Sequence, residues 1–312
     1  MREEGQIMHH NSEKAKEKQT GYLHQNFRLF HLKDKKNQEF EFHYHDFNKI
    51  IIFLSGNVTY FVEGKAYDLK PWDILLVNNH DIHKPVIDAG VTYERIVIWL
   101  QPEFIREQQD RSCDLSRCFT TATAKRFNLI RLNHHLQADI QTILQQLESS
   151  LASREFGHEA LSQAYFLQFM VYLNRIFLPE TCQPDFSASR YDRQIADILS
   201  YINLHLAEDL SNETLSRQFF VSKYYLMHKF KEHTGYTLHA YVQQKRLLHA
   251  KDLIQEGTPI LKASSLCGFS DYSTFLRAFR KFYGISPKAF LTSGSEPSGF
   301  RDARTDITHI PY

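Results

Sequence analysis

The C-terminal third of this chain repeats itself once, and the repeat constrains the fold more than any other feature of the sequence. The segment "SKYYLMHKFKEHTGYT" aligns with "DYSTFLRAFRKFYGIS" at an offset of 49 residues. Self-similarity at a fixed offset predicts one structural unit that is built twice. The matched pairs are Leu226 and Phe275, His228 and Arg277, Phe230 and Phe279, Lys231 and Arg280, Gly235 and Gly284, and Thr237 and Ser286.

Each copy predicts a short helix, a tight turn and a second, capped helix. The short helices are "NETLSRQFF" and "ILKASSLCG", and we expect Ser222 and Ser270 to be the N-caps of the helices that follow. Gly268 suits the turn of the second copy, because glycine adopts conformations closed to other residues. Phe220 stands in the turn of the first copy, and we expect it to be buried against an inter-domain surface. This pattern is typical of a helix-turn-helix, here present twice.

The helix that joins the two units, about Thr237 to Gln255, would be roughly 28 Å long at 1.5 Å per residue. One turn of B-DNA is about 34 Å long, so both units could enter successive major grooves. The alternative is an ordinary helical bundle with no role in binding DNA. Under either interpretation, we expect the apolar side chains along one face of the two capped helices to form the hydrophobic core. They are Leu226, Phe230, Phe275, Phe279 and Phe282.

Charge is spread unevenly along the chain. The whole protein carries a formal net charge of only +1. Between Arg190 and Thr292, however, there are 14 basic and 9 acidic side chains, against 23 and 27 in the remainder. A basic C-terminal region on an acidic remainder predicts that a polyanion would contact the C-terminal part.

The N-terminal half predicts a β-rich domain followed by two helices. From residue 22 to 100, short β-branched and aromatic runs alternate with the turn sequences SGN, EGK, KPWD and NNHD, which is typical of a barrel or sandwich. Beyond residue 134 the apolar period changes to that of a helix. These helices either pack only on each other and on the β domain, or also form a homodimer. The apolar stripe of the first helix consists of Leu136, Ile140, Ile143, Leu144, Leu147 and Leu151. That of the second helix consists of Leu161, Tyr165, Phe169, Tyr172, Leu173 and Ile176.

The expected fold class is therefore α+β and multidomain. We expect a polar tail over 1–20, a sensing β domain over 21–133, a helical dimerisation segment over 134–178, a linker over 179–189, a DNA-binding domain over 190–292 and a tail over 293–312. The N-terminus has no apolar core of a signal peptide, no apolar run is long enough for a membrane span, and the four cysteines are irregularly spaced. These features predict a reduced, cytoplasmic protein.

Residues 190–292 resemble the DNA-binding domain of the AraC/XylS family of bacterial transcription regulators. The segment "GFSDYSTFLRAFRKFYGISPKAF" closely follows the family's signature. The N-terminal part resembles the cupin-like sensor domain of many members, and the helices at 134–178 stand where their dimerisation helices lie. The resemblance implies a nucleoid-associated homodimer that binds double-stranded DNA and a small effector such as a carbohydrate. It also implies contact with RNA polymerase, usually as an activator.

In this family the first turns of each recognition helix contact bases. Arg277 is the strongest candidate, because guanidinium can bond bidentately to guanine, although a phosphate contact or plain surface charge is the alternative. The first helix offers weaker hydrogen-bonding groups, so we expect it to read thymine methyls and DNA shape. The candidate base contacts are Tyr224, Met227, His228, Ser273, Thr274 and Arg277. The candidate phosphate contacts are Ser222, Lys223, Lys231, Ser270, Arg280 and Lys281.

The segment "EFHYHDFNK" places His43 and His45 on one face of an extended chain. Metal-binding cupins add an acid and a later histidine. Here His83 matches the later histidine, but Lys49 stands at the acid's place, and an ammonium repels a cation. Asp46 should point the other way. We therefore expect no metal and no cofactor, but a polar effector pocket lined by His43, His45, Lys49, Tyr60, His83 and Trp99.

Several alternatives remain open from the sequence. The three histidines could form a metal site, or they could satisfy only local hydrogen bonds. The chain could then be a metal-dependent cupin enzyme with an appended DNA-binding domain, or an architectural DNA-binding protein without a ligand. No Ser-His-Asp set, P-loop or dinucleotide fingerprint is discernible. We therefore expect a regulator without catalytic residues.

Overall fold

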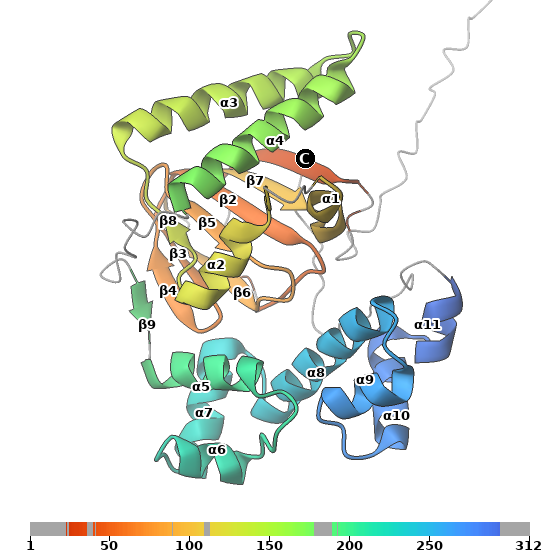
Figure 1. Ribbon diagram of the computed structural model, residues 1–312. Helices are drawn as coiled ribbons and strands as arrows, with labels where there is room; N and C mark the ends of the chain where they lie inside the picture. The colour runs from red at the N-terminus through yellow and green to blue at the C-terminus, as the bar shows by residue number, and fades with distance from the viewer. Residues whose placement is uncertain are drawn as a thin grey trace, which may run out of the picture.

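The computed structural model describes residues 25–35, 42–88, 90–108, 113–177, 189–191 and 193–293, together with Leu23 and Phe40. A β domain lies in the middle of Figure 1, a helical hairpin lies above it and a group of C-terminal helices lies below it. The tails expected at 1–20 and 293–312 and the linker expected at 179–189 lie outside the described residues, except for Ser293, which ends a helix, and Ser189, which begins a strand.

Two antiparallel sheets make up the β domain. In hydrogen-bonding order, the first contains β1 (Phe27–Asp34), β7 (Tyr93–Leu100), β2 (Asn48–Ser55), β5 (Ile74–Val77) and β8 (Leu129–Ile130). The second contains β6 (His83–Ile87), β3 (Val58–Val62), β4 (Lys65–Asp68) and β9 (Ser189–Tyr191). Because β9 directly precedes the C-terminal helices, its pairing with β4 attaches those helices to the edge of a sheet.

Alternation along the central strand β2 separates two hydrophobic cores. Ile51 and Phe53 pack into a core to which both sheets contribute, together with Tyr60 and Val62 of β3. Ile50 and Ile52, whose side chains are on the opposite face of β2, pack against helices instead. The strands are therefore apolar on both faces, as is typical of a sheet that is covered on both sides.

Four helices cover the outer face of the first sheet. They are α1 (Pro102–Glu107), α2 (Arg117–Lys125), α3 (His134–Ala152) and α4 (His158–Phe177). The antiparallel pair α3 and α4 packs on the sheet through one continuous core, which confirms the expected packing of the two helical stripes on the β domain. At the free end of this hairpin, Leu151, Phe156 and Leu161 are exposed.

The C-terminal part consists of seven helices in the described range. They are α5 (Arg193–Leu204), α6 (Asn212–Gln218), α7 (Lys223–Thr234), α8 (Leu238–Gln255), α9 (Ile260–Leu266), α10 (Tyr272–Tyr283) and α11 (Pro287–Ser293). Helices α6 and α7 form the first helix-turn-helix, α9 and α10 form the second, and α8 joins them. Each unit has its own hydrophobic core, and the predicted members of the apolar stripe lie in these cores.

The turns and caps confirm part of the local prediction and correct the rest. Ser222 caps α7 by accepting a hydrogen bond from the Tyr225 amide. The cap of α10 is Asp271 and not Ser270, because the carboxylate of Asp271 accepts from the Thr274 amide. Phe220 is 94% exposed, so the prediction that it is buried was wrong.

The exposure of Phe220 follows from its backbone. Its φ of 54° lies in the left-handed region, close to the φ of 79° at Gly268. Both turns therefore place a left-handed residue directly after the first helix, although the second turn is one residue longer. In the first unit the phenylalanine ring at this position is in solvent. Within the described ranges, no helix is both long and apolar enough to cross a membrane.

Candidate nucleic-acid interface and sensor pocket

The first turns of α7 and α10 present exposed side chains, as a DNA-reading helix requires. All six candidate base contacts are exposed, and they are Tyr224, Met227, His228, Ser273, Thr274 and Arg277. The two helices differ in chemistry. On α7 the rings of Tyr224 and His228 stack with centroids 6.1 Å apart, which makes a largely apolar surface. On α10 the Arg277 guanidinium donates to Thr274 Oγ1 at 3.2 Å, which makes a hydrogen-bonding surface.

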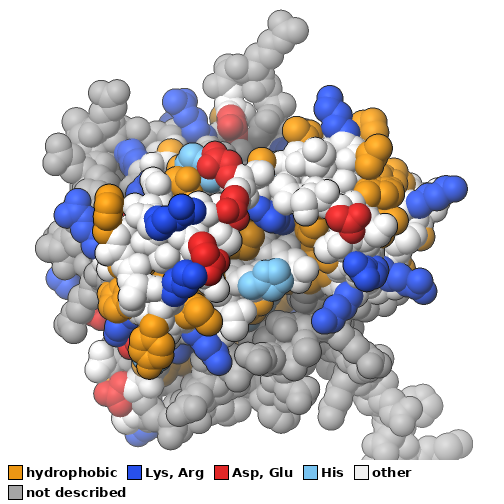
Figure 2. All heavy atoms as spheres, turned by 90° about the horizontal axis from the view of Figure 1, so that it is seen from below, with side chains coloured by type: hydrophobic (Ala, Val, Ile, Leu, Met, Phe, Trp, Pro, Cys, Tyr) orange, Lys and Arg blue, Asp and Glu red, His pale blue; other side chains and the backbone are white. Residues whose placement is uncertain are grey.

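The candidate phosphate contacts surround these helices and are exposed as well: Ser222, Lys223, Lys231, Ser270, Arg280 and Lys281. Basic side chains are spread across the face seen from below, with acidic ones gathered near its middle (Figure 2). Lys223 forms an ion pair with Glu213 of the preceding helix. Its ammonium is therefore already positioned at the start of α7, where the helix N-terminus adds positive potential.

Helix α8 sets the distance between the two units. It contains 18 residues, begins at the Thr237 cap and ends at Gln255, as predicted. Its length is about 27 Å at 1.5 Å per residue, somewhat less than one turn of B-DNA. In Figure 1 the first unit lies at one end of α8 and the second unit at the other, below the β domain.

The three predicted histidines come together at one end of the space between the two sheets. His43 and His83 exchange two backbone hydrogen bonds, of 3.1 and 2.9 Å. One nitrogen atom from each of His43, His45 and His83 lies within 4.8 Å of those of the other two. The three ring centroids are 4.4 to 5.3 Å apart. The strand geometry therefore gathers side chains that lie about forty positions apart in the sequence.

Lys49 completes this cluster through a direct hydrogen bond. Its Nζ lies 2.9 Å from His83 Nε2. His83 Nδ1 lies 2.8 Å from the Asp81 carbonyl oxygen, which can only accept, so Nδ1 carries the proton and Nε2 carries the lone pair. Lys49 therefore donates to His83. The lysine occupies the position that faces the imidazole lone pair, where a metal ion would have to bind.

Burial disfavours the charged forms of His45, His83 and Lys49. Desolvation, followed by the charge of Lys49, lowers the pKa of His45 and of His83 well below the usual value. Desolvation also lowers the pKa of Lys49 to about 7. A protonated imidazole at His45 or His83 would lack the hydration that stabilises its charge, so burial favours the neutral form of both rings.

The two aromatic candidates lie beside the histidines. The Tyr60 ring lies parallel to His83 with centroids 6.1 Å apart, and Trp99 stacks on Phe47 at 4.7 Å and lies 6.2 Å from His45. All six predicted pocket residues thus belong to one cluster. Asp46 points away from it, as expected, and its carboxylate contacts His80 instead.

A partly buried carboxylate that the sequence did not single out joins the β domain to α8. Glu63 stands at the tip of the β3–β4 turn and accepts from Lys245 Nζ at 2.9 Å and Tyr241 Oη at 2.6 Å, both on α8. Burial alone would raise its pKa, but the charge of Lys245 and the hydrogen bond from Tyr241 lower it overall. The sequence indicates the turn EGK that contains Glu63. It does not indicate this contact, because the partners of Glu63 lie 178 and 182 positions away in the chain.

The segment from Phe42 to Asp46 serves both the pocket and this inter-domain contact. His43 and His45 face the pocket. Phe42 and Asp46 face the C-terminal helices, because Phe42 packs on Gly235 and accepts from the Tyr236 hydroxyl, while Asp46 lies 3.7 Å from the Lys251 ammonium. Alternate residues of one extended segment therefore contact two different parts of the protein.

Comparison with known proteins finds a matching protein family for each half of the chain. Residues 29–170 match the family described as the AraC-like ligand-binding domain, and residues 215–293 match a helix-turn-helix domain family. Among curated proteins, the HTH-type transcriptional activator RhaS of Escherichia coli O139:H28 is 24% identical over 255 residues, which span 80% of this chain and 87% of RhaS. RhaS of Salmonella schwarzengrund is 24% identical over 247 residues, which span 79% and 85%.

Among solved structures, unsaturated fatty acid-bound ToxT from Vibrio cholerae strain SCE256 is 16% identical. The match covers 86% of this chain and 97% of ToxT, with a TM-score of 0.36. A score this low carries no inference about the ligand.

Proposed function

This chain belongs to the AraC family of transcription regulators, and from that premise we propose that it activates transcription when both of its helix-turn-helix units bind DNA. A ligand-binding domain and a DNA-binding domain in one chain make a regulator that responds to a small molecule. The relatives named RhaS are transcriptional activators, which supports the same direction of control here. In this proposal RNA polymerase is the partner at the promoter.

The observation that carries the DNA-binding part of the proposal is the pair of exposed, capped helices α7 and α10 in the two units that α8 joins. We assign base contacts to their first turns, with Arg277 reading a guanine and α7 reading thymine methyls through Tyr224 and Met227. The surrounding basic and hydroxyl side chains hold the phosphates, which fixes the register without selecting a sequence.

The effector in this proposal binds at the cluster of His43, His45, Lys49, Tyr60, His83 and Trp99. The cluster combines aromatic faces with hydrogen-bonding nitrogen atoms. Such a combination suits a small polar molecule such as a carbohydrate, which presents an apolar ring face and many hydroxyl groups. The ligand would shift an equilibrium between arrangements of the domains that already exists without it.

We propose a homodimer held by the α3–α4 hairpin. Leu151, Phe156 and Leu161 expose apolar side chains at its free end, although most of both helices is buried on the β domain. Exposed apolar side chains that cluster in this way are typical of a surface that contacts another protein.

A metal-dependent enzyme is the rival interpretation, and the close approach of three imidazoles favours it. We propose instead that the site functions without a metal, because the Lys49 amine already faces the His83 lone pair. Elemental analysis of the purified protein separates the two interpretations. Stoichiometric iron, manganese or zinc that is lost in His43→Ala would restore the enzyme interpretation.

The experiment that tests the proposed function is selection of bound duplexes from a random DNA pool, followed by footprinting at a stated salt concentration. We expect two protected major grooves about one helical turn apart. We also expect that adding the effector increases transcription from a promoter that carries the selected site. Enrichment of no sequence, with and without candidate effectors, would contradict the proposal.

A further inference from the structure

We propose that Arg246 is the positioning residue that fixes the angle between the two helix-turn-helix units, and through it the spacing of the two DNA half-sites that the protein accepts. This inference rests on the proposed function, because it concerns how two DNA-reading units act together. Arg246 lies in the middle of α8. It is not one of the residues assigned to DNA, to the effector or to the contact with the β domain.

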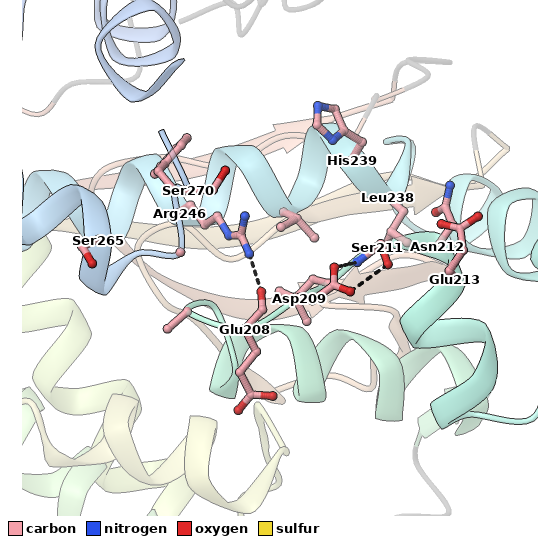
Figure 3. Close-up of a pocket in the computed structure, with 15 residues that line it drawn as sticks. Glu208, Asp209, Ser211, Asn212, Glu213, Leu238, His239, Arg246, Ser265 and Ser270 are labelled. Atoms are coloured by element: carbon pink, nitrogen blue, oxygen red, sulfur yellow. Dashed lines mark hydrogen bonds between the residues drawn. The ribbon is translucent and has the colours of Figure 1, made fainter. Parts of the chain in front are cut away.

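The guanidinium of Arg246 binds the backbone of the first unit. Its Nε donates to the Leu206 carbonyl at 2.8 Å, and its Nη2 donates to the Glu208 carbonyl at 2.6 Å. Both carbonyls belong to the segment between α5 and α6, and Figure 3 shows the side chain reaching from α8 to this segment. Two separate donors of one planar group hold the segment in a defined orientation, which a single hydrogen bond would not do.

The turn of the second unit packs against the same place. A Cβ atom added to Gly268 would lie 2.4 Å from the Leu206 carbonyl oxygen and 2.9 Å from Arg246 Nη2. The turn of the second unit therefore contacts both the guanidinium and the carbonyl to which it is bound. Three parts of the domain meet at this point: the joining helix, the α5–α6 segment of the first unit and the turn of the second unit.

Apart from the close contact at Gly268, little apolar packing joins the two units. Among the described residues, the hydrophobic core of the first unit and that of the second share no member. A hollow of about 660 Å³ lies between the units and is lined from both sides, by Asp209 and Glu213 of the first and by Ser265 and Ser270 of the second (Figure 3). A rigid angle therefore needs directional contacts, and Arg246 supplies two of them.

The angle matters because both recognition helices must fit the same duplex. One base pair inserted between the half-sites separates them by about 3.4 Å and rotates one against the other by roughly 35°. A rigid pair of units rejects such an insertion strongly. A pair that is free to rotate accepts it more readily, but binds every two-half-site duplex more weakly because binding must then order the units.

Arg246→Met in the full-length chain tests the proposal. The DNA probes are the selected duplex, duplexes that keep only one half-site, and the selected duplex with one inserted base pair. We expect Arg246→Met to bind each half-site within about twofold of the wild type and the complete site at least about tenfold more weakly, a loss of about 1.4 kcal/mol of coupling. We also expect a smaller penalty for the insertion. Arg246→Lys should behave like Arg246→Met, because lysine keeps the positive charge but lacks the two planar N–H donors that bind both carbonyls.

Arg193→Met, on the exposed start of α5, is the matched control and should change none of these affinities. Equal losses on half-sites and on the complete site would overturn the proposal, because they would indicate general damage to the domain. An unchanged insertion penalty would overturn it as well.

A second measurement keeps the test independent of DNA binding. The distance distribution between spin labels on α7 and α10, without DNA, should be narrow in the wild type and broad in Arg246→Met. If the wild type selects no duplex, the proposed function fails, and this distance measurement still decides the role of Arg246. Equally narrow distributions would refute that role.

Discussion

The two helix-turn-helix units share the left-handed positions of their backbone but differ in turn length and in surroundings. In both, the residue after the C-cap of the first helix is left-handed, and it is Phe220 in the first unit and Gly268 in the second. In both, the recognition helix ends at a left-handed glycine, Gly235 or Gly284. These two left-handed positions recur in both units, while the residue at the turn and the length of the turn differ.

The surroundings explain why the residues differ. At Gly268 the backbone of another segment approaches so closely that no Cβ fits, whereas Phe220 faces solvent. The first unit also packs on the β domain, since its core includes Ile82 and contacts Phe42, while the core of the second unit contains only C-terminal residues among those described. A change in the β domain therefore reaches the core of the first unit directly, whereas the core of the second unit includes no β-domain residue among those described.

The largest expected effect that tests this comparison is that of Gly268→Ala. The added methyl would collide with the backbone of the first unit and would also strain a φ of 79°. We expect a loss of more than about 3 kcal/mol in the free energy of unfolding, measured by urea denaturation. Gly257→Ala is the control, because its φ is 89° but nothing lies within 4 Å, so it should lose only about 1 kcal/mol. Equal losses in both variants would show that the approach of the two units is not close.

Glu63→Gln should weaken the contact between the β domain and α8. The change leaves the Lys245 ammonium, which is only 10% exposed, without its ion-pair partner. We expect a loss of about 2 to 3 kcal/mol in the free energy of unfolding, while exposed Glu256→Gln should have almost no effect. In a double-mutant cycle with Lys245→Met, additive losses would contradict a direct interaction.

The same pair predicts a dependence on pH. Since the contacts with Lys245 and Tyr241 lower the pKa of Glu63 in the folded state, its stabilisation is fully present above the pKa of the unfolded chain. It is lost as the pH falls through the lowered pKa. The acid loss of stability should therefore be smaller in Glu63→Gln, as followed by thermal denaturation between pH 7 and pH 3.

The chemistry of the two recognition helices should differ when DNA is bound. Arg277→Ala removes the guanidinium of the second unit and should cost about 1 to 3 kcal/mol on the selected duplex, mostly at one guanine. His228→Ala, at the matched position of the first unit, should cost less than about 1 kcal/mol. Binding titrations on duplexes with single base changes measure both. A uniform loss across sequences in Arg277→Ala would identify it as a phosphate contact.

Phe220→Gly should have a small effect on the free energy of unfolding, and it is the one variant here that should increase it. A phenylalanine with a φ of 54° is strained, and its ring makes little packing because it is exposed. We expect a gain of about 1 kcal/mol in the free energy of unfolding, reduced by the extra freedom of glycine in the unfolded chain. A loss of stability would show that the ring is held by contacts of its own.

Much of this architecture could be predicted because its determinants are local. Amphipathic period, the Ser222 cap and the repeated turn determine the two units from residues close together in the chain. The cap of α10 was misassigned because Ser270 and Asp271 are adjacent and both are good capping residues. The exposure of Phe220 was missed because burial was inferred from its hydrophobicity, whereas the left-handed turn decides its direction.

The contacts between domains could not be predicted in the same way. Neither Glu63 nor Lys245 has a neighbour in the sequence that points to the other, and the three residues of β9 are too few to carry a strand pattern. The histidine cluster was predicted only because a resemblance supplied its long-range pairing. Its members lie on two separate segments, which the hydrogen bonds between His43 and His83 bring together.

The alternation from Phe42 to Asp46 has a consequence for the timing of any response. The side chains that face the pocket and those that face the C-terminal helices hang from the same few peptide groups, one of which, the His45 carbonyl, accepts from the His80 amide at 2.8 Å. A molecule that holds His43 and His45 thereby slows the opening of the backbone on which Phe42 and Asp46 depend. Amide exchange at these positions would then depend on the residence time of the bound molecule. A slowly dissociating molecule would keep the contact between the domains closed for as long as it is bound.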